Sequence, residues 1–408
     1  MRAAARWLAA LAWSLLPVAL VLSHRNLVVV LTLLAVAGVL SAGPRALLAR
    51  PSAWSWPLLA LAAYLAVSSL WTPAVGDRDW AYRVPLFVLT VMGALLAARM
   101  PGGTRGFGLS VLVACVLLGF EGLTGGLIRD LVPPPNAPDR DDVSTARGVG
   151  LAVVLLPACA LCLRRAFGRA GLAMASIAAA CLLAGAARFD IAANPIALMA
   201  MLGAATATVP RRTRGAASGA LVMVAAGFVV FPIFAALLPE ARVLEALTEG
   251  PVSWRQRLVI WRTVADATLA GPMVFAFGAG QQASAALGEA AGTAVLAGAP
   301  IPLPRVPTHP HNVFLQVWYE AGALGCALAA GGLILAARRL AASAVPADAA
   351  LAIAATAGAA FVFLAVDASL WTLWRGAALA LAACAISRCA RASPRSRRRG
   401  VVHRAFTA

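Results

Sequence analysis

The sequence has little charge of either sign, and it contains no lysine. Charged residues make up 12% of the 408-residue chain, against about 25% in a soluble domain, whereas hydrophobic residues make up 62%. Mean hydropathy is +0.85. This composition excludes an ordinary cytosolic enzyme, a disordered chain and a secreted domain held by disulfides. It predicts an all-α protein that crosses a membrane many times.

Cysteine and histidine are also scarce, with seven and four residues respectively. Cys159 and Cys162 have the spacing of a redox or metal-binding pair, but neither a second pair nor a histidine accompanies them in the sequence. We therefore expect them to pack between helices. Cys389 falls in the basic C-terminal segment. We expect no disulfide, no metal site and no cofactor.

Twelve apolar runs predict a polytopic transmembrane bundle of about 12 helices. They lie at about residues 7–23, 27–42, 55–71, 82–98, 106–128, 147–163, 171–187, 194–209, 215–238, 313–337, 350–366 and 369–387. The first run lacks a good cleavage site for a signal peptide, so we interpret it as a retained helix. The expected organisation is nine helices within residues 1–238, a polar loop at 239–312, three helices within 313–387 and a basic tail at 388–408.

Arginine is distributed unevenly along the chain. If the N-terminus is cytoplasmic, every short cytoplasmic loop is basic, the C-terminal tail is basic as well, and Asp348 is the only acid beside them. The net charge of +18 is then a topology signal rather than a sign of nucleic-acid binding. Both termini are expected in the cytoplasm, and the loop at 239–312 is expected on the opposite side.

Several charged residues lie near the expected outer ends of the runs. They are Arg83, Glu121, Arg188, Asp367 and Arg375. Each alone could extend to the membrane interface. As a group beside a long outer loop, they favour binding or chemistry at that surface. A transporter would more often place its charges at the midplane of the membrane.

The long loop contains a predicted amphipathic helix at residues 252–270. Its expected apolar stripe consists of Trp254, Leu258, Trp261, Ala265 and Leu269. Arg255 and Arg262 share one flank, where Arg262 can pair with Asp266 at i,i+4. Arg257 lies on the other flank, and no acid of this helix neutralises it. Such an arginine could bind the phosphate of one specific lipid or contact the headgroups of bulk phospholipids. These residues alone do not favour one of the two interpretations over the other.

Two of the four histidines, His309 and His311, flank Pro310 where the loop returns to the membrane. A histidine can accept a proton near neutral pH, as a general base must. Asn312 is expected to cap the following helix. Isolated interfacial histidines more often cap helices or contact headgroups, but the rigid turn beside an arginine-bearing loop favours a functional site.

This part of the chain resembles the signature of the O-antigen ligase and polymerase family. The matching residues are His311, Asn312, Leu315, Gln316, Glu320, Gly322 and Gly325, preceded by Arg257, Trp261, Pro272, Gly278 and Gly280. The family also has a Ser-Arg pair at the outer end of an earlier helix, for which Ala187-Arg188 is the best match. The specific resemblance covers about residues 180–335.

The resemblance implies glycosyl transfer from an undecaprenyl-diphosphate-linked glycan to an acceptor hydroxyl. It implies a bacterial inner-membrane enzyme with a periplasmic active site that works by metal-independent, inverting displacement. Arg257 and Arg188 would bind the diphosphate, and His311 would accept the proton of the acceptor. Candidate supporting residues are His309, Asn312, Arg255, Arg262, Glu320 and Arg375. Glu320 is also a rival base, but it lies about 13 Å deeper along the helix.

Three alternatives remain at this point. We favour ligation to lipid A-core, but a polymerase that adds to a second lipid-linked glycan would use the same site. A polysaccharide-lipid transporter or flippase predicts internal pseudo-symmetry and activity without His311. A structural membrane subunit predicts that each outer arginine and histidine is replaceable. The expected partners are the donor and acceptor glycolipids and membrane lipids, with no nucleic acid.

Overall fold

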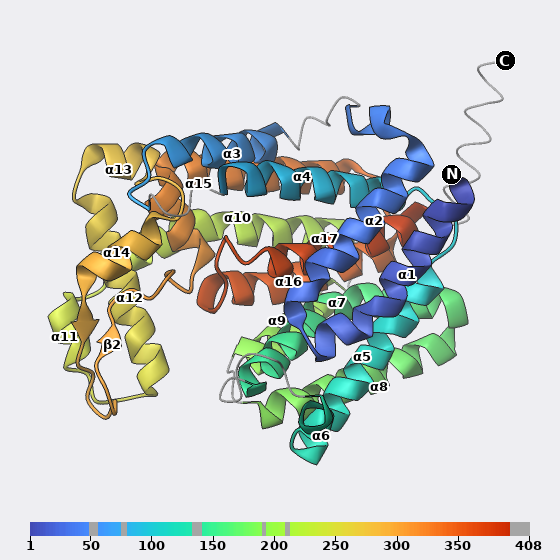
Figure 1. Cartoon of the computed structure of the whole chain (residues 1–408), viewed down its shortest axis with the longest axis horizontal. Coiled ribbons are helices and arrows are strands. Elements are labelled where there is room, and N and C mark those ends of the chain that lie inside the picture. The colour runs from blue at the N-terminus through green and yellow to red at the C-terminus, as the bar shows by residue number, and fades with distance from the viewer. Residues whose placement is uncertain (49–55, 75–79, 133–140, 190–192, 209–212, 392–408) are drawn as a thin grey trace.

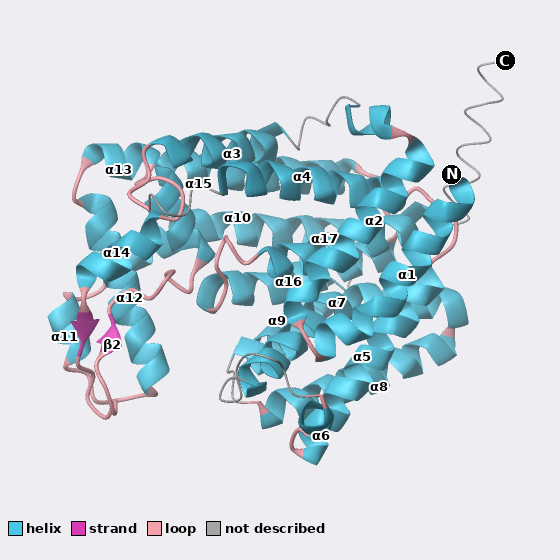
Figure 2. Ribbon diagram, viewed as in Figure 1, coloured by secondary structure: helices cyan, strands magenta, loops and turns pink. Residues whose placement is uncertain are grey.

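The computed structural model describes residues 1–48, 56–74, 80–132, 141–189, 193–208 and 213–391. These residues form a helical bundle with one small two-stranded ribbon (Figures 1 and 2). In the ribbon, β1 (Thr293–Ala294) pairs antiparallel with β2 (Leu303–Pro304).

Nine helices in the described ranges are long and apolar enough to cross a membrane, judged by length and composition. They are α1 (Arg2–Val21), α2 (Leu27–Ala42) taken together with the turn before it as His24–Ala42, α5 (Thr104–Thr124), α7 (Asp141–Phe167), α8 (Arg169–Arg188), α10 (Thr213–Leu237), α15 (Val313–Ala342), α16 (Ala347–Val366) and α17 (Leu373–Arg391). Three shorter apolar helices are α3 (Trp56–Val67), α4 (Trp80–Ala97) and α9 (Ala193–Thr208). A polytopic helix bundle is therefore confirmed, and membrane crossing by the three shorter helices stays a prediction.

Short helical turns connect some of these helices: η1 (His24–Asn26), η2 (Pro44–Leu48), η4 (Ser68–Leu70) and α6 (Leu127–Leu131). Within the bundle, α10 packs along α15, α16 along α9, α5 along α8, and α1 along α2. Helix α17 packs against α7, α16 and α4, so the last helix lies inside the bundle rather than at its edge. The largest apolar cluster joins the first helices to α7 and α17.

The predicted polar loop is a folded segment, which we call the loop segment (residues 239–312). It contains α11 (Ala241–Glu245), α12 (Val252–Leu269), α13 (Pro272–Phe277), α14 (Ala283–Ala291) and the β ribbon. Its elements gather at one end of the bundle, and the N-terminus lies at the other end (Figure 1). The helix predicted at 252–270 is confirmed as α12.

The buried face of α12 differs from the predicted apolar stripe. Leu269 is exposed, and Trp254 and Leu258 are only partly buried. The buried positions are Arg255, Val259, Ile260, Trp261, Val264, Ala265 and Thr268. The reason is that α12 is covered from two sides. Ile260 and Trp261 belong to a cluster with α10 and α15, whereas Val259 packs with apolar residues of α11 and the β ribbon.

Helix α15 is interrupted at Gly322, where φ is 66° and ψ is −169°. Near this kink, the Tyr319 and Glu320 carbonyls accept hydrogen bonds from the backbone N–H groups of Ala279, at 2.8 Å, and Gly280, at 3.1 Å. A Cβ on Gly322 would lie 2.5 Å from the Ala276 carbonyl. Residues 276–280 and 319–322 thus meet backbone to backbone, and we call this contact the clasp. It fixes the loop segment against α15.

The clasp predicts an unequal response to two glycine substitutions in α15. Gly322→Ala should lower the free energy of unfolding by about 2 kcal/mol or more, since its φ is positive and the added Cβ overlaps the backbone of residue 276. Gly331→Ala is the control, because a Cβ there meets no atom within 4 Å and alanine favours the helix. Thermal unfolding in detergent measures both, and equal midpoints would contradict the importance of the clasp.

Candidate functional site

The turn containing His309 and His311 leads directly into α15. Pro310 is buried, and its carbonyl accepts a hydrogen bond of 3.2 Å from the indole nitrogen of Trp261 on α12. His311 has a φ of 53°, which is rare for a residue with a side chain. Its backbone N–H donates to Nδ1 of His309 at 3.2 Å, and the two rings lie 4.3 Å apart. The turn is therefore held from both sides, with the two imidazoles in contact.

Asn312 follows this turn as the N-cap of α15, as predicted. Its side-chain oxygen accepts a hydrogen bond of 3.1 Å from the Leu315 N–H, which satisfies one of the free donors at the start of the helix. Asn312 is completely buried. The cap therefore sets where the helix starts and, with it, where His311 is placed.

Both histidines are neutral at pH 7. Burial lowers the pKa of His309 to about 3, helped by the neighbouring His311 and by Arg375. Burial likewise lowers the pKa of His311 to about 4, where the carboxylate of Asp367 opposes the effect and the arginines Arg257 and Arg375 add to it. Nδ1 of His311 is buried and has no hydrogen-bond partner among the described residues. A neutral imidazole can accept a proton.

Arg257 extends from α12 toward the end of α16. Its Nε donates to the Val366 carbonyl at 2.9 Å, and its Nη1 donates to the Ser253 carbonyl at 3.0 Å. Its guanidinium also lies 5.6 Å from the centre of the Trp254 ring. Burial lowers the pKa of Arg257, and the carboxylate of Asp367 raises it. Since an arginine has five N–H donors, these two bonds orient the group without using all of its donors.

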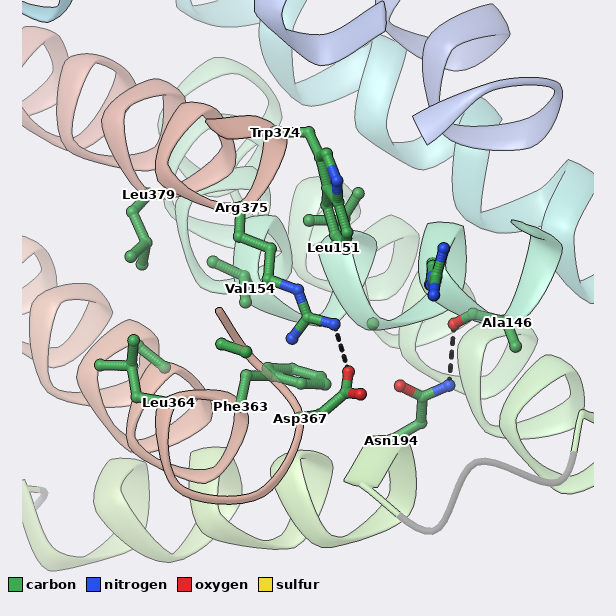
Figure 3. A pocket seen from close by; sticks show the side chains of 14 residues that line it. Ala146, Leu151, Val154, Asn194, Phe363, Leu364, Asp367, Trp374, Arg375 and Leu379 are labelled. Atoms are coloured by element: carbon green, nitrogen blue, oxygen red, sulfur yellow. Dashed lines mark hydrogen bonds and ion pairs between the residues drawn. The ribbon is translucent and has the colours of Figure 1, made fainter. Parts of the chain in front are cut away.

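A pocket lies between α7, α9, α16 and α17 (Figure 3), and its lining includes Asp367, whose carboxylate acts on Arg257. At its polar side, Arg375 points toward Asp367 and forms an ion pair with it. Asn194 donates to the Ala146 carbonyl at 3.0 Å. The remaining wall is apolar and includes Leu151, Val154, Phe363, Leu364, Trp374 and Leu379. The pocket thus combines a charged side with a hydrocarbon wall.

Arg147 also lines this pocket, from α7. The charges of Arg147, Arg375 and Asp367 all act on both histidines, so the pocket and the histidine turn share one electrostatic environment. We call Arg147, Arg257 and Arg375 the arginine cluster. Among the described residues, Asp367 is the carboxylate that acts on the histidines together with these three guanidinium groups, so the site is suited to an anion.

Arg255 and Arg262 serve the loop segment itself. The Arg255 side chain is buried and donates to the carbonyls of Leu247 and, at 2.6 Å, Ala297. Arg262 donates to the carbonyls of Ala236, at 2.8 Å, and Leu238, at 2.6 Å, at the end of α10. It also forms the predicted ion pair with Asp266, at 2.7 Å. Both guanidinium groups are therefore engaged in structural contacts.

Glu320 is completely buried in α15, behind the histidine turn. One carboxyl oxygen accepts from Ser284 Oγ at 2.7 Å and Gln316 Nε2 at 3.0 Å. The other accepts from the Gln282 N–H at 3.1 Å and Trp371 Nε1 at 2.8 Å. Four donors converge on this one group, so its role is to join α14, α15 and the α16–α17 connection.

Arg188 is not among the residues that line the pocket, and its role in diphosphate binding stays a prediction. Arg188 is exposed at the last residue of α8, and within the described residues it has no hydrogen bond or ion pair with the arginine cluster. Asp190, which follows it in the sequence, lies outside the described residues. Arg147, which no motif indicated, lines the pocket and acts electrostatically on both histidines. Its only sequence signal is that it stands at the start of the apolar run at 147–163.

His24 is a second residue near the site that the sequence motifs did not indicate. It is buried, its Nδ1 lies 3.2 Å from Ser144 Oγ, and its ring meets Trp374 edge to face with centroids 4.6 Å apart. Trp374 in turn lies 4.6 Å from the guanidinium of Arg375. The first helices therefore support the wall of the pocket.

Within the described ranges, no three side chains of the metal-binding types come together. No protein-family model, curated protein or solved structure matches this chain. The family resemblance thus depends on the motifs quoted above, and a function has to be argued from the geometry of the site.

The two partly buried histidines, His309 and His311, predict a loss of stability in acid. Their pKa values in the folded protein lie below the ordinary value of 6.5, so the unfolded chain binds more protons between about pH 6.5 and 3. Stability should be constant above about pH 6.5 and fall as the pH drops through this window. Melting midpoints in detergent measure it, and the double variant His309→Gln/His311→Gln should show a shallower fall. An identical pH dependence in wild type and variant would contradict the assignment.

Proposed function

We propose that the protein is a membrane glycosyltransferase that moves a glycan from undecaprenyl diphosphate to an acceptor hydroxyl. The observation that carries the proposal is a neutral, partly buried His311 within the field of three arginines, which shares its electrostatic environment with an apolar-walled pocket. A diphosphate attached to a long hydrocarbon chain has the matching chemistry: two phosphates for the arginine cluster and an apolar chain for the bundle.

The donor carries its own leaving group, so the reaction needs no nucleotide. As the glycosidic bond breaks, negative charge develops on the diphosphate, and preorganised guanidinium groups stabilise it. Arg257 is suited to this role because two backbone carbonyls hold it in place, with donors remaining for a ligand. Arg375 is suited as well, once a phosphate competes with Asp367 for its guanidinium.

His311 would take the proton of the acceptor hydroxyl as that oxygen attacks the anomeric carbon. A single direct displacement inverts the configuration at this carbon. The low pKa of His311 comes from burial and from the nearby arginines, so a diphosphate that neutralises them would raise its pKa. Glu320 is a poor rival base, because four donors already occupy its carboxyl group.

We favour ligation of O-antigen to lipid A-core, in the bacterial inner membrane with the loop segment in the periplasm. A polymerase of O-antigen or exopolysaccharide would use the same residues and differ only in its acceptor. A transporter of polysaccharide lipids is a more distant alternative. It is disfavoured because the arginine cluster lies at the loop end of the bundle rather than midway along the helices.

The proposal predicts that His311→Ala and Arg257→Ala lose transfer activity while remaining folded. The assay supplies an undecaprenyl-diphosphate glycan with either lipid A-core or a second lipid-linked glycan, in detergent and with a chelator present. Losing the base should cost about 10²–10⁴-fold in rate, and losing Arg257 about 10²–10³-fold. Product analysis by gel and mass spectrometry distinguishes ligation from chain growth.

Arg242→Ala is the matched control, because Arg242 is an exposed arginine in the same loop segment. It should keep full activity, and all variants should elute as wild type in size exclusion. Undiminished transfer by His311→Ala would remove the proposed base. Failure of the wild type with every acceptor, combined with glycolipid transport in vesicles, would support the transporter instead.

A separate comparison tests which arginine binds the diphosphate together with Arg257. Arg147→Ala should reduce transfer by about tenfold or more, because Arg147 lines the pocket and acts on both histidines. Arg188→Ala should stay within about fivefold of wild type, since an exposed charge is worth about 1 kcal/mol or less. Measured kcat/KM for both variants tests this, and the reverse order would assign the diphosphate to Arg188 as the family motif implies.

A further inference from the structure

The Cys-x-x-Cys segment of α7 has a partner that the sequence did not indicate. Helix α17 continues to Arg391, beyond the predicted start of the tail at residue 388, and Cys389 lies on its buried side. Its sulfur is 3.2 Å from the sulfur of Cys162. The two residues are 227 positions apart in the sequence. We propose that Cys162 and Cys389 are a reversible oxidation site, forming a disulfide that links α7 to α17.

The distance supports bond formation with little rearrangement. A disulfide bond is about 2.0 Å long, so the sulfurs need to approach by only about 1 Å. Both side chains are buried between helices that pack against each other, so neither needs to leave its position to meet the other. Cys159, one turn earlier on α7, points elsewhere, since its thiol donates to the Gly108 carbonyl at 3.2 Å.

The surroundings of the pair hold charge in an otherwise apolar region. Arg165, three residues after Cys162, donates to the Cys389 carbonyl. Its other nitrogens bind the Asp348 carboxylate at 2.9 and 2.7 Å. Reactive cysteines are often found beside such a cation. The hydrogen bond from Arg165 to the Cys389 carbonyl fastens α7 to α17 beside the two sulfurs, and the ion pair with Asp348 holds Arg165 in place.

The reaction needs a two-electron oxidant of the disulfide or azo class. Since Cys162 and Cys389 are both fully buried, the end of α17 has to open transiently for the oxidant to reach one thiolate, which attacks it and forms a mixed adduct. The second thiolate then displaces the reduced oxidant and forms the S–S bond. The two cysteines together lose two protons and two electrons, which the oxidant takes up. An azo compound becomes a hydrazine, and a small-molecule disulfide becomes two thiols. A dithiol reductant reverses the process.

The bond would fasten the far end of a helix that also serves the candidate site. Helix α17 carries Trp374 and Arg375 at one end and Cys389 at the other. Oxidation would therefore restrict any movement of α17 against α7, whether or not the proposed transfer reaction is correct.

The experiment treats the full-length protein in detergent with the azo oxidant diamide, then unfolds it and alkylates the free thiols. We expect two of the seven cysteines to escape alkylation and to regain it after dithiothreitol. Trypsin should release residues 148–164 joined to residues 389–391, a species that mass spectrometry identifies directly. The melting midpoint of the oxidised protein should rise, since the link closes a long loop in the unfolded chain.

Cys162→Ser and Cys389→Ser should each abolish the joined peptide and the rise in melting midpoint. Cys159→Ser is the matched control on the same helix and should keep both. Full alkylation of both cysteines in the treated wild type would overturn the proposal. A bond between Cys159 and Cys162 would overturn it equally, because the pair would then lie within α7. None of these results depends on glycan transfer.

Discussion

The buried carboxyl group of Glu320 is the contact on which the loop end of the molecule depends. It accepts hydrogen bonds from the start of α14, from its own helix and from the connection between α16 and α17. Burying a carboxyl group without these donors would cost free energy, so the four hydrogen bonds make the burial of Glu320 possible. Burial in turn strengthens the hydrogen bonds, because water is excluded from them. Gln316 extends the network by accepting from the Leu370 N–H at 2.8 Å. Three segments distant in the sequence thereby take their positions from one turn of α15.

The clasp adds a backbone component to the same region. Gly278 and Gly322 let two stretches of main chain approach where no side chain would fit. With the clasp behind it and the Asn312 cap in front, the first part of α15 is a rigid reference for the site. The histidine turn is attached to its start. The end of α16, which receives Arg257 and carries Asp367, is connected to it through Gln316 and Trp371.

The sequence predicted those features that depend on runs of residues. A membrane-spanning helix needs a continuous apolar stretch, and each of the twelve apolar runs coincides with a helix. The periodicity of apolar residues at 252–270 predicts α12. The Asn312 cap and the Arg262–Asp266 pair are local, within three or four residues, and were also predicted correctly.

The predictions that failed depend on partners far away in the chain. No residue near Arg255 in the sequence indicates that its guanidinium binds the carbonyls of Leu247 and Ala297. The buried face of α12 is wider than the predicted apolar stripe, because the β ribbon covers a second side of the helix. Cys389 was assigned to a basic tail because arginines surround it. One of them, Arg388, donates to the carbonyls of Met100 and Pro101, at 3.0 and 3.3 Å, and so becomes part of the packed bundle.

The charges around His311 suggest how the proposed chemistry would be confined to the donor-bound enzyme. Burial and the arginine cluster make His311 a weak base when no anion is present. A bound diphosphate would neutralise the cluster and compete with Asp367 for Arg375, and both changes raise the proton affinity of His311. The base would then gain strength only when the donor is in place. Because the same charges that hold the leaving group set the pKa of the base, donor binding and acceptor activation would be coupled without any movement of the helices.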